Sequence, residues 1–534
     1  MDRTRSVVDS AATLSRRQAL KLTGVAGAAS LFGLREMGGA SAALLQDQAT
    51  EPRPGGSITV VTEADWVDLD PHLNGLFAGR QAIQFAYESL TQFDENLAAA
   101  PALAESWETA GNQTFTFKLR QGVTWHDGSP FTAEDVVYSF ERVLNPDNGA
   151  ASRSVVSVID AMEIVDTHTV RFSLSAPKLF FPEALANLAG TMIIKAGSAD
   201  DGDLKQRVNG TGPFLVDEVR AGDFIRFTKN PNYWGAPIPY VDELILKLMV
   251  EEDTRVAWLR TGQADYIDLY AEAAARLEDE DGVTVLQSQK AYMMGIRLNV
   301  KDGPFSDGRV RRALDMAMDR QDMIEKARFG AAELTGFIPT GYGEWSLPAD
   351  QLPAWYAERD VEGAKQLLAD AGYADGFSFG IKCSRPEHVA MALVAKENWK
   401  ELGIEAEVVQ MEYGAYFADN TARNFETIVV GNTFNPDPND YLWGWYHTEG
   451  SQNAFGYSNP DLDTQLDAAR VTTDPEQLKQ QLAQIQQELW DDGAPYLHAY
   501  NALNLEGLQD RVHGYEPTFA ATRSSLKQSW VENS

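Results

Sequence analysis

Alternating apolar and polar residues dominate the first half of the chain and predict paired strands. A β-branched run at 57–62 follows a linker rich in Pro and Gly and predicts the first strand. A run at 241–250 also alternates and predicts another strand. Two stretches have apolar residues at helical spacing instead, at 79–90 and 132–144. Three further stretches alternate on both sides of a turn, and they predict hairpins at 110–128, 161–174 and 212–235.

From about Gln287 the pattern changes to longer segments, which indicates a second lobe. Helical spacing predicts a long amphipathic helical stretch at 307–330 and another helix at 360–372. A polar helix is predicted at 474–493, before a last strand-like stretch at 494–507. Between these helices, strand and helix patterns alternate at 377–384, 386–403, 404–411, 414–424 and 425–432. Such alternation is typical of a parallel sheet with crossover helices.

Length, charge and cysteine content limit the classes of protein that the chain could belong to. A chain of 534 residues predicts two or three domains. The net charge of −33 disfavours binding to phosphate backbones or anionic lipid, because like charges repel, so nucleic acid is not an expected partner. Cys383 is the only cysteine, which rules out a disulfide within the chain and a cysteine-based metal site.

The first 42 residues have the features of an export signal. The pair Arg16 and Arg17, followed by Leu20 and Lys21, resembles a twin-arginine signal, although Ala19 stands where that pattern has Phe. The apolar run that follows is short and rich in Gly, which disfavours a membrane anchor, and 40–42 offers small residues for cleavage. We therefore expect export to the periplasm or the outer face of the cell membrane. No cysteine is placed to carry a lipid anchor.

Motifs of enzymes and metal sites are weak in this sequence. The segment 376–380 contains G-x-S-x-G, which alone would suggest a serine hydrolase that uses Ser378. However, a helical pattern precedes this serine and strand-like alternation continues through it, whereas a nucleophile elbow needs the reverse order. The seven histidines show no pairing at helical spacing, and no metal or cofactor is expected. The secreted hydrolase remains the alternative of a different class.

The segment 431–450 is rich in carboxylates and aromatic rings. Counted from Asp437, a calcium loop would need glycine where Leu442 stands and glutamate where Thr448 stands. Pro436 and Pro438 flank Asp437 and favour a turn in which this residue caps a helix. We therefore interpret Asp437 as a structural residue rather than a metal ligand.

Four ordered blocks resemble the extracytoplasmic substrate-binding proteins of peptide/nickel-type ABC importers, at 103–144, 209–235, 310–324 and 364–373. The resemblance extends over about 55–520. It implies an α/β, two-lobed periplasmic-binding-protein fold, type II-like and of cluster C, with an extra small subdomain in the first lobe. It also implies a monomer without enzymatic activity that captures a solute by hinge closure and delivers it to ABC permease subunits.

The resemblance and the sequence pattern together predict the domain boundaries. We expect hinge strands near 287–292 and 492–496. The expected parts are the signal at 1–42, lobe I at 43–95, its subdomain at 96–189, its second part at 190–286, lobe II at 287–494 and the return of lobe I at 495–534.

The ligand is left open between a peptide and an oligosaccharide. Peptide binders of the family hold the ligand amine with an Asp in a W-x-x-D segment, and alignment on Asp437 places Phe434 there and Gly431 at the Trp. A buried ammonium without a counter-charge is penalised by several kcal/mol, which weakens the peptide interpretation unless Asp65 or Glu63 substitutes. Aromatic rings could instead hold sugars or pack in a core. The predicted ligand-binding residues are Glu63, Asp65, Trp66, Tyr292, Met294, Asn432, Phe434, Trp443, Trp445 and Tyr446.

Overall fold

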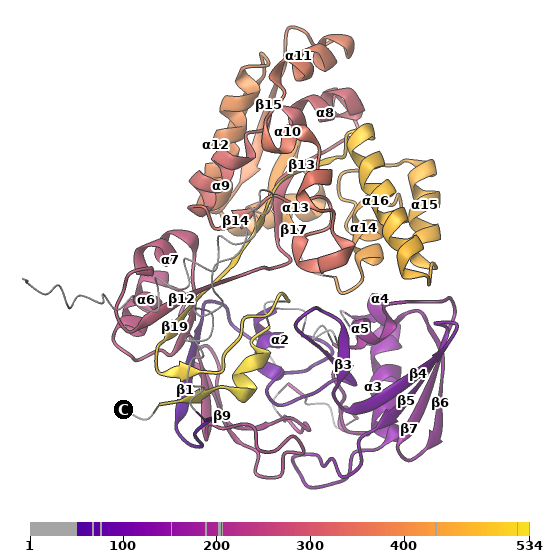
Figure 1. Cartoon of the computed structure of the whole chain (residues 1–534), viewed down its shortest axis with the longest axis vertical. Coiled ribbons are helices and arrows are strands. Elements are labelled where there is room, and N and C mark those ends of the chain that lie inside the picture. The colour runs from indigo at the N-terminus through magenta and orange to yellow at the C-terminus, as the bar shows by residue number, and fades with distance from the viewer. Residues whose placement is uncertain are drawn as a thin grey trace, which may run out of the picture. The chain divides into compact units, whose positions relative to one another are not determined.

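Three larger β-sheets organise the chain in the computed structural model (Figure 1). Every described helix and strand lies in the unit Pro52–Ser534. The predicted export signal and Phe434 lie outside the described residues. Those are 51–66, 69–74, 77–150, 152–186, 190–200, 204–205, 207–432, 435–520 and 522–532. Within these ranges, no helix combines the length and the apolarity that a membrane crossing requires.

A mixed seven-stranded sheet forms the first lobe, in the order β12-β19-β11-β1-β10-β9-β8. The first strand lies at its centre, parallel to both neighbours, and buries Ile58 and Val60. The strands are β1 (Ser57–Thr62), β8 (Phe214–Arg220), β9 (Phe224–Lys229), β10 (Glu243–Leu248), β11 (Tyr266–Asp268), β12 (Val283–Ser288) and β19 (Asn504–Gln509). The helices are α2 (Phe77–Ile83), α6 (Glu252–Arg260) and α7 (Ala271–Leu277). The predicted hairpin at 212–235 is confirmed as β8 and β9, whereas the helix predicted at 79–90 ends at Ile83.

A four-stranded antiparallel sheet, in the order β4-β5-β7-β6, has its own core of phenylalanines. The hairpin predicted at 161–174 is confirmed, and the turn of the one predicted at 110–128 is confirmed, although its first strand lies before that range, at Ala104–Ala110. The turn of this first hairpin has Gly111 and Asn112 at its centre, both with positive φ, and the backbone N–H of Gln113 donates to the carbonyl of Ala110 at 3.2 Å. The strands and helices are β4 (Ala104–Ala110), β5 (Thr114–Leu119), β6 (Ile159–Asp166), β7 (Thr169–Leu174), α3 (Ala133–Leu144), α4 (Arg153–Val156) and α5 (Phe181–Leu185), beside a small pair β2 (Thr91–Phe93) and β3 (Ala99–Pro101).

A six-stranded sheet, in the order β14-β18-β13-β17-β15-β16, forms the second lobe. The expected parallel pairing holds for β15, the first of the three helix-linked strands, with both of its neighbours. The central strand β13 instead pairs antiparallel with β17 and β18. The strands are β13 (Met293–Leu298), β14 (Ala332–Glu333), β15 (Ser378–Cys383), β16 (Glu405–Gln410), β17 (Thr427–Asn432) and β18 (Tyr496–Ala502). The helices are α8 (Gly308–Met316), α9 (Arg320–Arg328), α10 (Ala354–Ala357), α11 (Val361–Asp370), α12 (Pro386–Lys400), α13 (Tyr413–Ala422), α14 (Pro438–Tyr446), α15 (Pro460–Arg470) and α16 (Pro475–Asp492).

The predicted helical stretch at 307–330 is divided into α8 and α9. The side chain of Asp319 accepts a hydrogen bond from the backbone N–H of Asp322 at 2.9 Å and caps the second helix. An N-cap residue has non-helical backbone angles, so the helix must be interrupted there.

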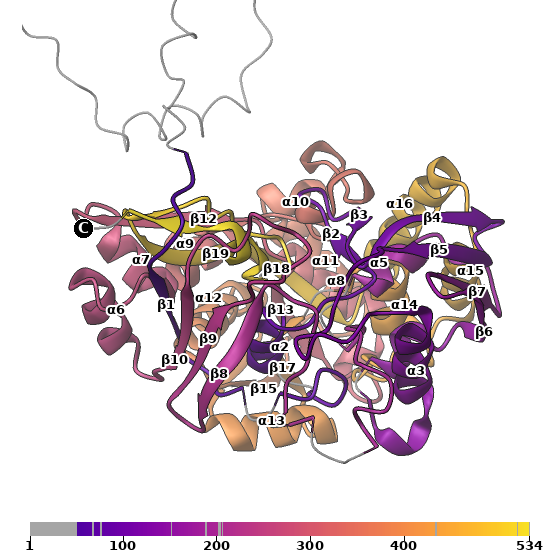
Figure 2. The ribbon, with the colours of Figure 1, turned by 90° about the horizontal axis from the view of Figure 1, so that it is seen from below.

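The chain passes between the two large sheets at two points. The first crossing, 289–292, joins β12 to β13 and coincides with the expected hinge near 287–292. The second lies at Leu503, between β18 and β19, which follow one another in yellow in Figure 2. This crossing is C-terminal to the expected 492–496, because β18 pairs with β13 and belongs to the second lobe. The chain ends with the small pair β20 (Val512–His513) and β21 (Trp530–Val531).

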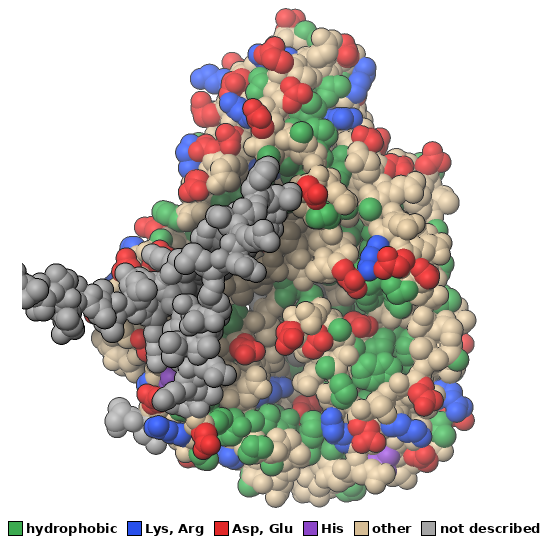
Figure 3. Space-filling model, in the orientation of Figure 1, with side chains coloured by type: hydrophobic (Ala, Val, Ile, Leu, Met, Phe, Trp, Pro, Cys, Tyr) green, Lys and Arg blue, Asp and Glu red, His purple; other side chains and the backbone are tan. Residues whose placement is uncertain are grey.

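Acidic side chains are spread over the visible face of the molecule, with fewer basic ones among them (Figure 3). This distribution agrees with the net charge of −33. Acidity is thus a property of the general surface rather than of one patch on that face.

Candidate functional site

The carboxyl end of β1 leads directly to two of the predicted residues, Glu63 and Asp65. In α/β sheets, ligands bind beyond the carboxyl ends of the strands. Glu63 Oε2 accepts a hydrogen bond of 2.5 Å from the hydroxyl of Tyr270 and lies 3.3 Å from Nη2 of the buried Arg255. Arg255 also donates to the carbonyls of Met249 and Val250. Glu63 is therefore neutralised within its own lobe, while Asp65 is exposed.

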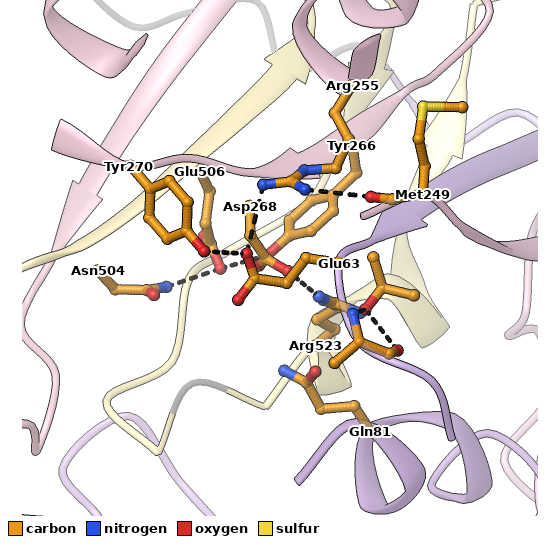
Figure 4. A network of polar contacts seen from close by, with 12 residues as sticks. Glu63, Gln81, Met249, Arg255, Tyr266, Asp268, Tyr270, Asn504, Glu506 and Arg523 are labelled. Carbon is orange, nitrogen blue, oxygen red and sulfur yellow. Dashed lines mark hydrogen bonds and ion pairs between the residues drawn. The ribbon is translucent and has the colours of Figure 1, made fainter. Parts of the chain in front are cut away.

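A second group of acids lies beside this one, where β11 and β19 run together (Figure 4). Asp268 forms an ion pair with the buried Arg523, and its Oδ1 accepts from the Tyr266 hydroxyl at 3.1 Å. Although burial acts in the opposite direction, the charge of Asp268 raises the pKa of Arg523. The arginine is thus held as a permanent cation against this acid.

Glu506 is the most buried acid of the group, at 2% exposure. Its Oε1 accepts hydrogen bonds from Tyr266 at 2.6 Å, Asn504 at 2.8 Å and Tyr515 at 2.9 Å. Its Oε2 has no hydrogen-bond partner among the described residues. Burial raises the pKa of this carboxyl, since the charged form loses its hydration there. The first-lobe wall therefore carries acids whose charges are already balanced or suppressed.

Two cations lie on the side of the second lobe, which we call the opposite wall. They are Lys290, from the first crossing, and Arg385, from the start of α12. Lys290 Nζ lies 5.0 Å from the ring centroid of Tyr292, and Arg385 Cζ lies 5.3 Å from that of Tyr413. Across the described ranges, neither cation forms an ion pair with an acid. Both are half-buried.

The pKa of Arg385 is influenced by residues of both lobes. Although burial opposes this, Tyr292, Glu387 and Tyr270 raise the pKa of Arg385, and Tyr270 belongs to the first lobe. Burial lowers the pKa of Lys290, with Asp268 of the first lobe acting in the opposite direction. Arg385 is also the N-cap of the 15-residue helix α12, where the helix dipole favours an anion. Both cations adjoin Tyr292, so a carboxylate beside that ring would lie near Arg385, the start of α12 and Lys290.

Three predicted residues are brought together by the pairing of β13 with β17. Tyr292 precedes β13, and its ring covers Gly431, where an added Cβ would lie 2.6 Å from the nearest ring carbon. Burial raises the pKa of Tyr292 to about 12. Asn432 is buried at the end of β17, whereas the side chain of Met294 packs in the hydrophobic core. Tyr292 is thus the one of the three that adjoins Arg385 and Lys290.

The predicted tryptophans and Tyr446 are engaged in packing. Trp66 is 2% exposed in the first-lobe core. Trp445 stacks on Tyr496 at 5.4 Å, and the Tyr446 hydroxyl shares a hydrogen bond of 2.8 Å with His498. These three rings have no open face in this conformation, as the core-packing alternative anticipated.

Trp443 is only half-buried, but its ring is also occupied. It stacks on His447 at 4.5 Å, carries the Arg470 guanidinium 4.4 Å from its ring centroid, and donates from Nε1 to Asp467 at 2.9 Å. The structure therefore does not bring Trp443 together with Tyr292 and Asn432 as a ligand platform.

Asp437 caps α14, as its flanking prolines predicted. Its Oδ1 accepts from the backbone N–H groups of Asn439 at 2.8 Å and Asp440 at 3.4 Å. The sequence analysis did not identify Lys290 and Arg385, nor Lys178, which pairs with Asp437 and Asp440 at the start of α14. Only Arg385 has a local signal, since it directly precedes Pro386 at the first position of a helix.

Ser378 is the first residue of β15, is exposed, and is followed by strand through Cys383. The next helix begins only at Pro386. A nucleophile elbow requires the helix directly after the serine. This local structure is that of a strand start.

Known proteins match most of the length of the chain. The family profile described as "Bacterial extracellular solute-binding proteins, family 5 Middle" matches residues 98–453. The glutathione-binding protein GsiB of Pectobacterium atrosepticum is 27% identical, with 82% of this chain and 87% of the relative covered. The oligopeptide-binding protein AppA of Bacillus subtilis is 26% identical, with 88% and 90% covered.

Solved structures show the same architecture. The periplasmic binding protein DppA of Helicobacter pylori, in complex with the peptide STSA, has a TM-score of 0.78 at 24% identity, with 90% of this chain and 99% of that chain covered. The binding protein AgaA of A. tumefaciens R10, in complex with agropinic acid, has a TM-score of 0.76 at 26% identity, with the same coverage. The predicted two-lobed α/β periplasmic-binding-protein fold is confirmed.

Proposed function

Because the chain belongs to the bacterial extracellular solute-binding proteins of family 5, we propose that it captures a peptide or peptide-like carboxylate between its two lobes. In this proposal the ligand is delivered to the permease subunits of an ABC importer. Ligand capture follows from closure of the lobes about the crossings at 289–292 and Leu503. A ligand stabilises the closed state only by as much as it binds that state more tightly.

The observation that carries the proposal is the pair of unpaired cations, Arg385 and Lys290. A carboxylate that entered between them would form charge-assisted hydrogen bonds, which are stronger than neutral ones. The ligands of similar proteins support this chemistry, since glutathione, peptides and agropinic acid all carry carboxylates. The ligand amine would find acids on the first-lobe wall, of which Asp65 is exposed.

Export by the twin-arginine pathway is part of the proposal. It rests on the sequence of the first 42 residues and on the extracellular character of the family. Replacing Arg16 and Arg17 together by lysine should leave the precursor inside the cell, whereas a chain exported by another route would still be processed. Fractionation and immunoblotting of the two forms distinguish these outcomes.

An uncharged oligosaccharide is the second candidate ligand. The exposed rings of Tyr270 (45%) and Tyr413 (51%), which adjoin Arg385, offer faces on which a sugar could stack. This candidate also follows from the absence of an acid at Phe434 in the sequence.

A thermal-shift screen separates the candidates. A ligand at about one hundred times its dissociation constant adds about 2.7 kcal/mol of stability. We expect shifts with free-carboxylate dipeptides, tripeptides and glutathione, and smaller or no shifts with the same peptides amidated at the C-terminus. Shifts with cello- or xylo-oligosaccharides and none with peptides would refute the carboxylate proposal. Labelling of Ser378 by a fluorophosphonate probe, lost in Ser378→Ala, would instead support the hydrolase alternative.

A further inference from the structure

Three residues of the first lobe, Lys178, Leu179 and Phe180, lie against the second lobe. We name them the latch segment. The backbone N–H of Lys178 donates to the carbonyl of Asn112 at 2.8 Å, which fixes the segment to the four-stranded sheet. The buried ring of Phe180 packs edge-on against Trp345 of the second lobe, with centroids 5.0 Å apart. The segment therefore belongs to one lobe by its backbone and contacts the other by its side chains.

Lys178 places its charge at the first turn of α14. Its Nζ pairs with Oδ2 of Asp440 and lies 3.4 Å from Oδ2 of Asp437. The other oxygen of Asp440 accepts from Arg470 Nε at 2.9 Å. Two carboxylates thus meet two cations, so the contact is balanced in charge. The side chains of Lys178 and Asp437 are only 9% and 5% exposed.

The partners of these charges are divided unequally between the lobes. Asp440 keeps Arg470, and Asp437 keeps the backbone N–H groups that it caps, whatever the first lobe does, because all of these belong to the second lobe. Among the described residues, Lys178 has its ion pairs only across the contact. Separation of the lobes would therefore remove every ion pair of Lys178 and none of those within the second lobe.

The electrostatics support a mutually stabilised contact. Although burial acts in the opposite direction, the carboxylates of Asp440 and Asp437 raise the pKa of Lys178. Likewise, against the effect of burial, the charges of Lys178 and Arg470 hold the pKa of Asp440 below its ordinary value. Burial and the neighbouring Asp440 raise the pKa of Asp437, so this acid depends most on the cation from the first lobe.

We propose that the latch segment closes on the N-terminus of α14 when the lobes come together, and that Lys178 thereby sets how long a captured ligand is retained. This inference rests on the proposed function of ligand capture. The latch shares no residue with the crossings at 289–292 and Leu503. Lys178 acts as a positioning residue, because it holds the lobes rather than the ligand. A change of Lys178 should therefore alter dissociation of every ligand alike, without changing the order of preference among ligands.

Lys178→Met tests the latch, because it removes the charge and keeps the apolar stem. Lys178→Arg keeps the charge and should rescue the effect. Lys382→Met is the matched control, since Lys382 pairs with Asp419 entirely within the second lobe. We expect Lys178→Met to speed ligand dissociation roughly tenfold in stopped-flow measurements, with little change in association, because interface changes act mainly on dissociation. Equal dissociation rates in wild type and Lys178→Met would overturn the proposal.

A measurement without ligand tests the latch segment independently of the proposed ligand-binding function. Spin labels at Val219→Cys in the first lobe and Leu393→Cys in the second, both exposed positions, report the distance between lobes in a Cys383→Ala background. We expect Lys178→Met to shift the distance distribution toward longer values, and Lys382→Met to leave it unchanged. If no tested solute binds but this shift occurs, the ligand assignment fails and the latch stands. An unchanged distribution with Lys178→Met refutes the latch, whatever the solute screen finds.

Discussion

The two walls that meet between the lobes treat their charges in opposite ways. On the first-lobe wall each arginine has an acid within the same lobe, as Arg255 has Glu63 and Arg523 has Asp268. On the opposite wall Lys290 and Arg385 have aromatic neighbours but form no ion pair with any described residue. Paired charges build a fixed surface, whereas half-buried cations that form no ion pair with a described residue can gain one from an incoming anion. The difference indicates where a ligand would supply the missing charge.

The largest expected effect comes from breaking a pair on the first-lobe wall. Arg523→Met leaves Asp268 beside the buried Glu506 without a cation. Removing one partner of a fully buried pair destabilises a protein by about 3–5 kcal/mol, and because the side chain of Asp268 is 34% exposed we expect a loss near the lower end of this range. Chemical denaturation should show a loss of this size, whereas the exposed pair of Arg309 with Asp307 should contribute little, so Arg309→Met serves as control. A loss below about 1 kcal/mol in Arg523→Met would mean that the first-lobe wall does not depend on its pairs.

Each lobe contains a buried histidine that should make the stability of the protein depend on pH. Burial lowers the pKa of His72 in the first lobe and of His388 in the second to about 4. Unfolded histidine titrates near 6.5, so between these values the unfolded chain binds more protons than the folded one. The free energy of unfolding should therefore include the full contribution of each histidine above pH 6.5. It should fall as the pH drops toward about 4, by up to about 3 kcal/mol for each histidine.

Urea unfolding at several pH values checks this expectation. His72→Phe and His388→Phe should each reduce the slope of stability against pH by about one proton. The His72 ring also shares a hydrogen bond of 2.8 Å with the carbonyl of Met192, so its variant should lose some stability at every pH. Neither ring nitrogen of His388 has a partner among the described residues, so that variant should lose less. An unchanged slope in both variants would contradict the assignment.

On the opposite wall, Arg385→Met should weaken ligand binding rather than folding. Hydrogen bonds to a charged group contribute about 1.5–3 kcal/mol, which corresponds to roughly a 10- to 150-fold loss of affinity. Arg385 forms no ion pair with a described acid, and the neighbouring Glu387 keeps its pair with Arg328, so the melting temperature of the free protein should change little. Arg359→Met is the control, since Arg359 pairs with Glu401 at an exposed site. Isothermal titration with a free-carboxylate peptide measures the effect, and an unchanged dissociation constant would remove Arg385 from the site.

How far the sequence predicts the molecule depends on the range of the interaction involved. The hairpin at Gly111 and the cap at Asp437 were predicted because a few neighbouring residues determine them. The return to the first lobe was misplaced because β18 lies between two strands and buries all of its residues, so it lacks the alternation that marks a strand at a surface. The division between α8 and α9 was missed because Asp319 also suits the polar face of a continuous helix.

The candidate site was less predictable than the fold. Aromatic residues near Asp437 were predicted to bind the ligand because they are close together in sequence. However, Trp445 and Tyr446 pack inside the second lobe. Arg385 and Lys290 stand out only when their lack of acidic partners is known, and that is a property of the whole arrangement. Lys178 meets Asp440 across 262 positions of sequence, and no local pattern encodes such a contact.

The smallest expected change in ligand affinity comes from replacing a packed ring, Trp443, rather than a cation. Trp443 already contacts His447 and Arg470, so a ligand would gain no free face from it. Trp443→Leu should therefore change ligand affinity by less than about twofold, as contacts outside an energetic centre do. It should lower stability by about 1–2 kcal/mol, since the ring's stacking and its hydrogen bond to Asp467 are lost. Titration with peptides and with oligosaccharides checks both ligand classes. A large loss of oligosaccharide affinity would show that this ring contacts the ligand. It would contradict our interpretation that the cations, and not the packed rings, bind it.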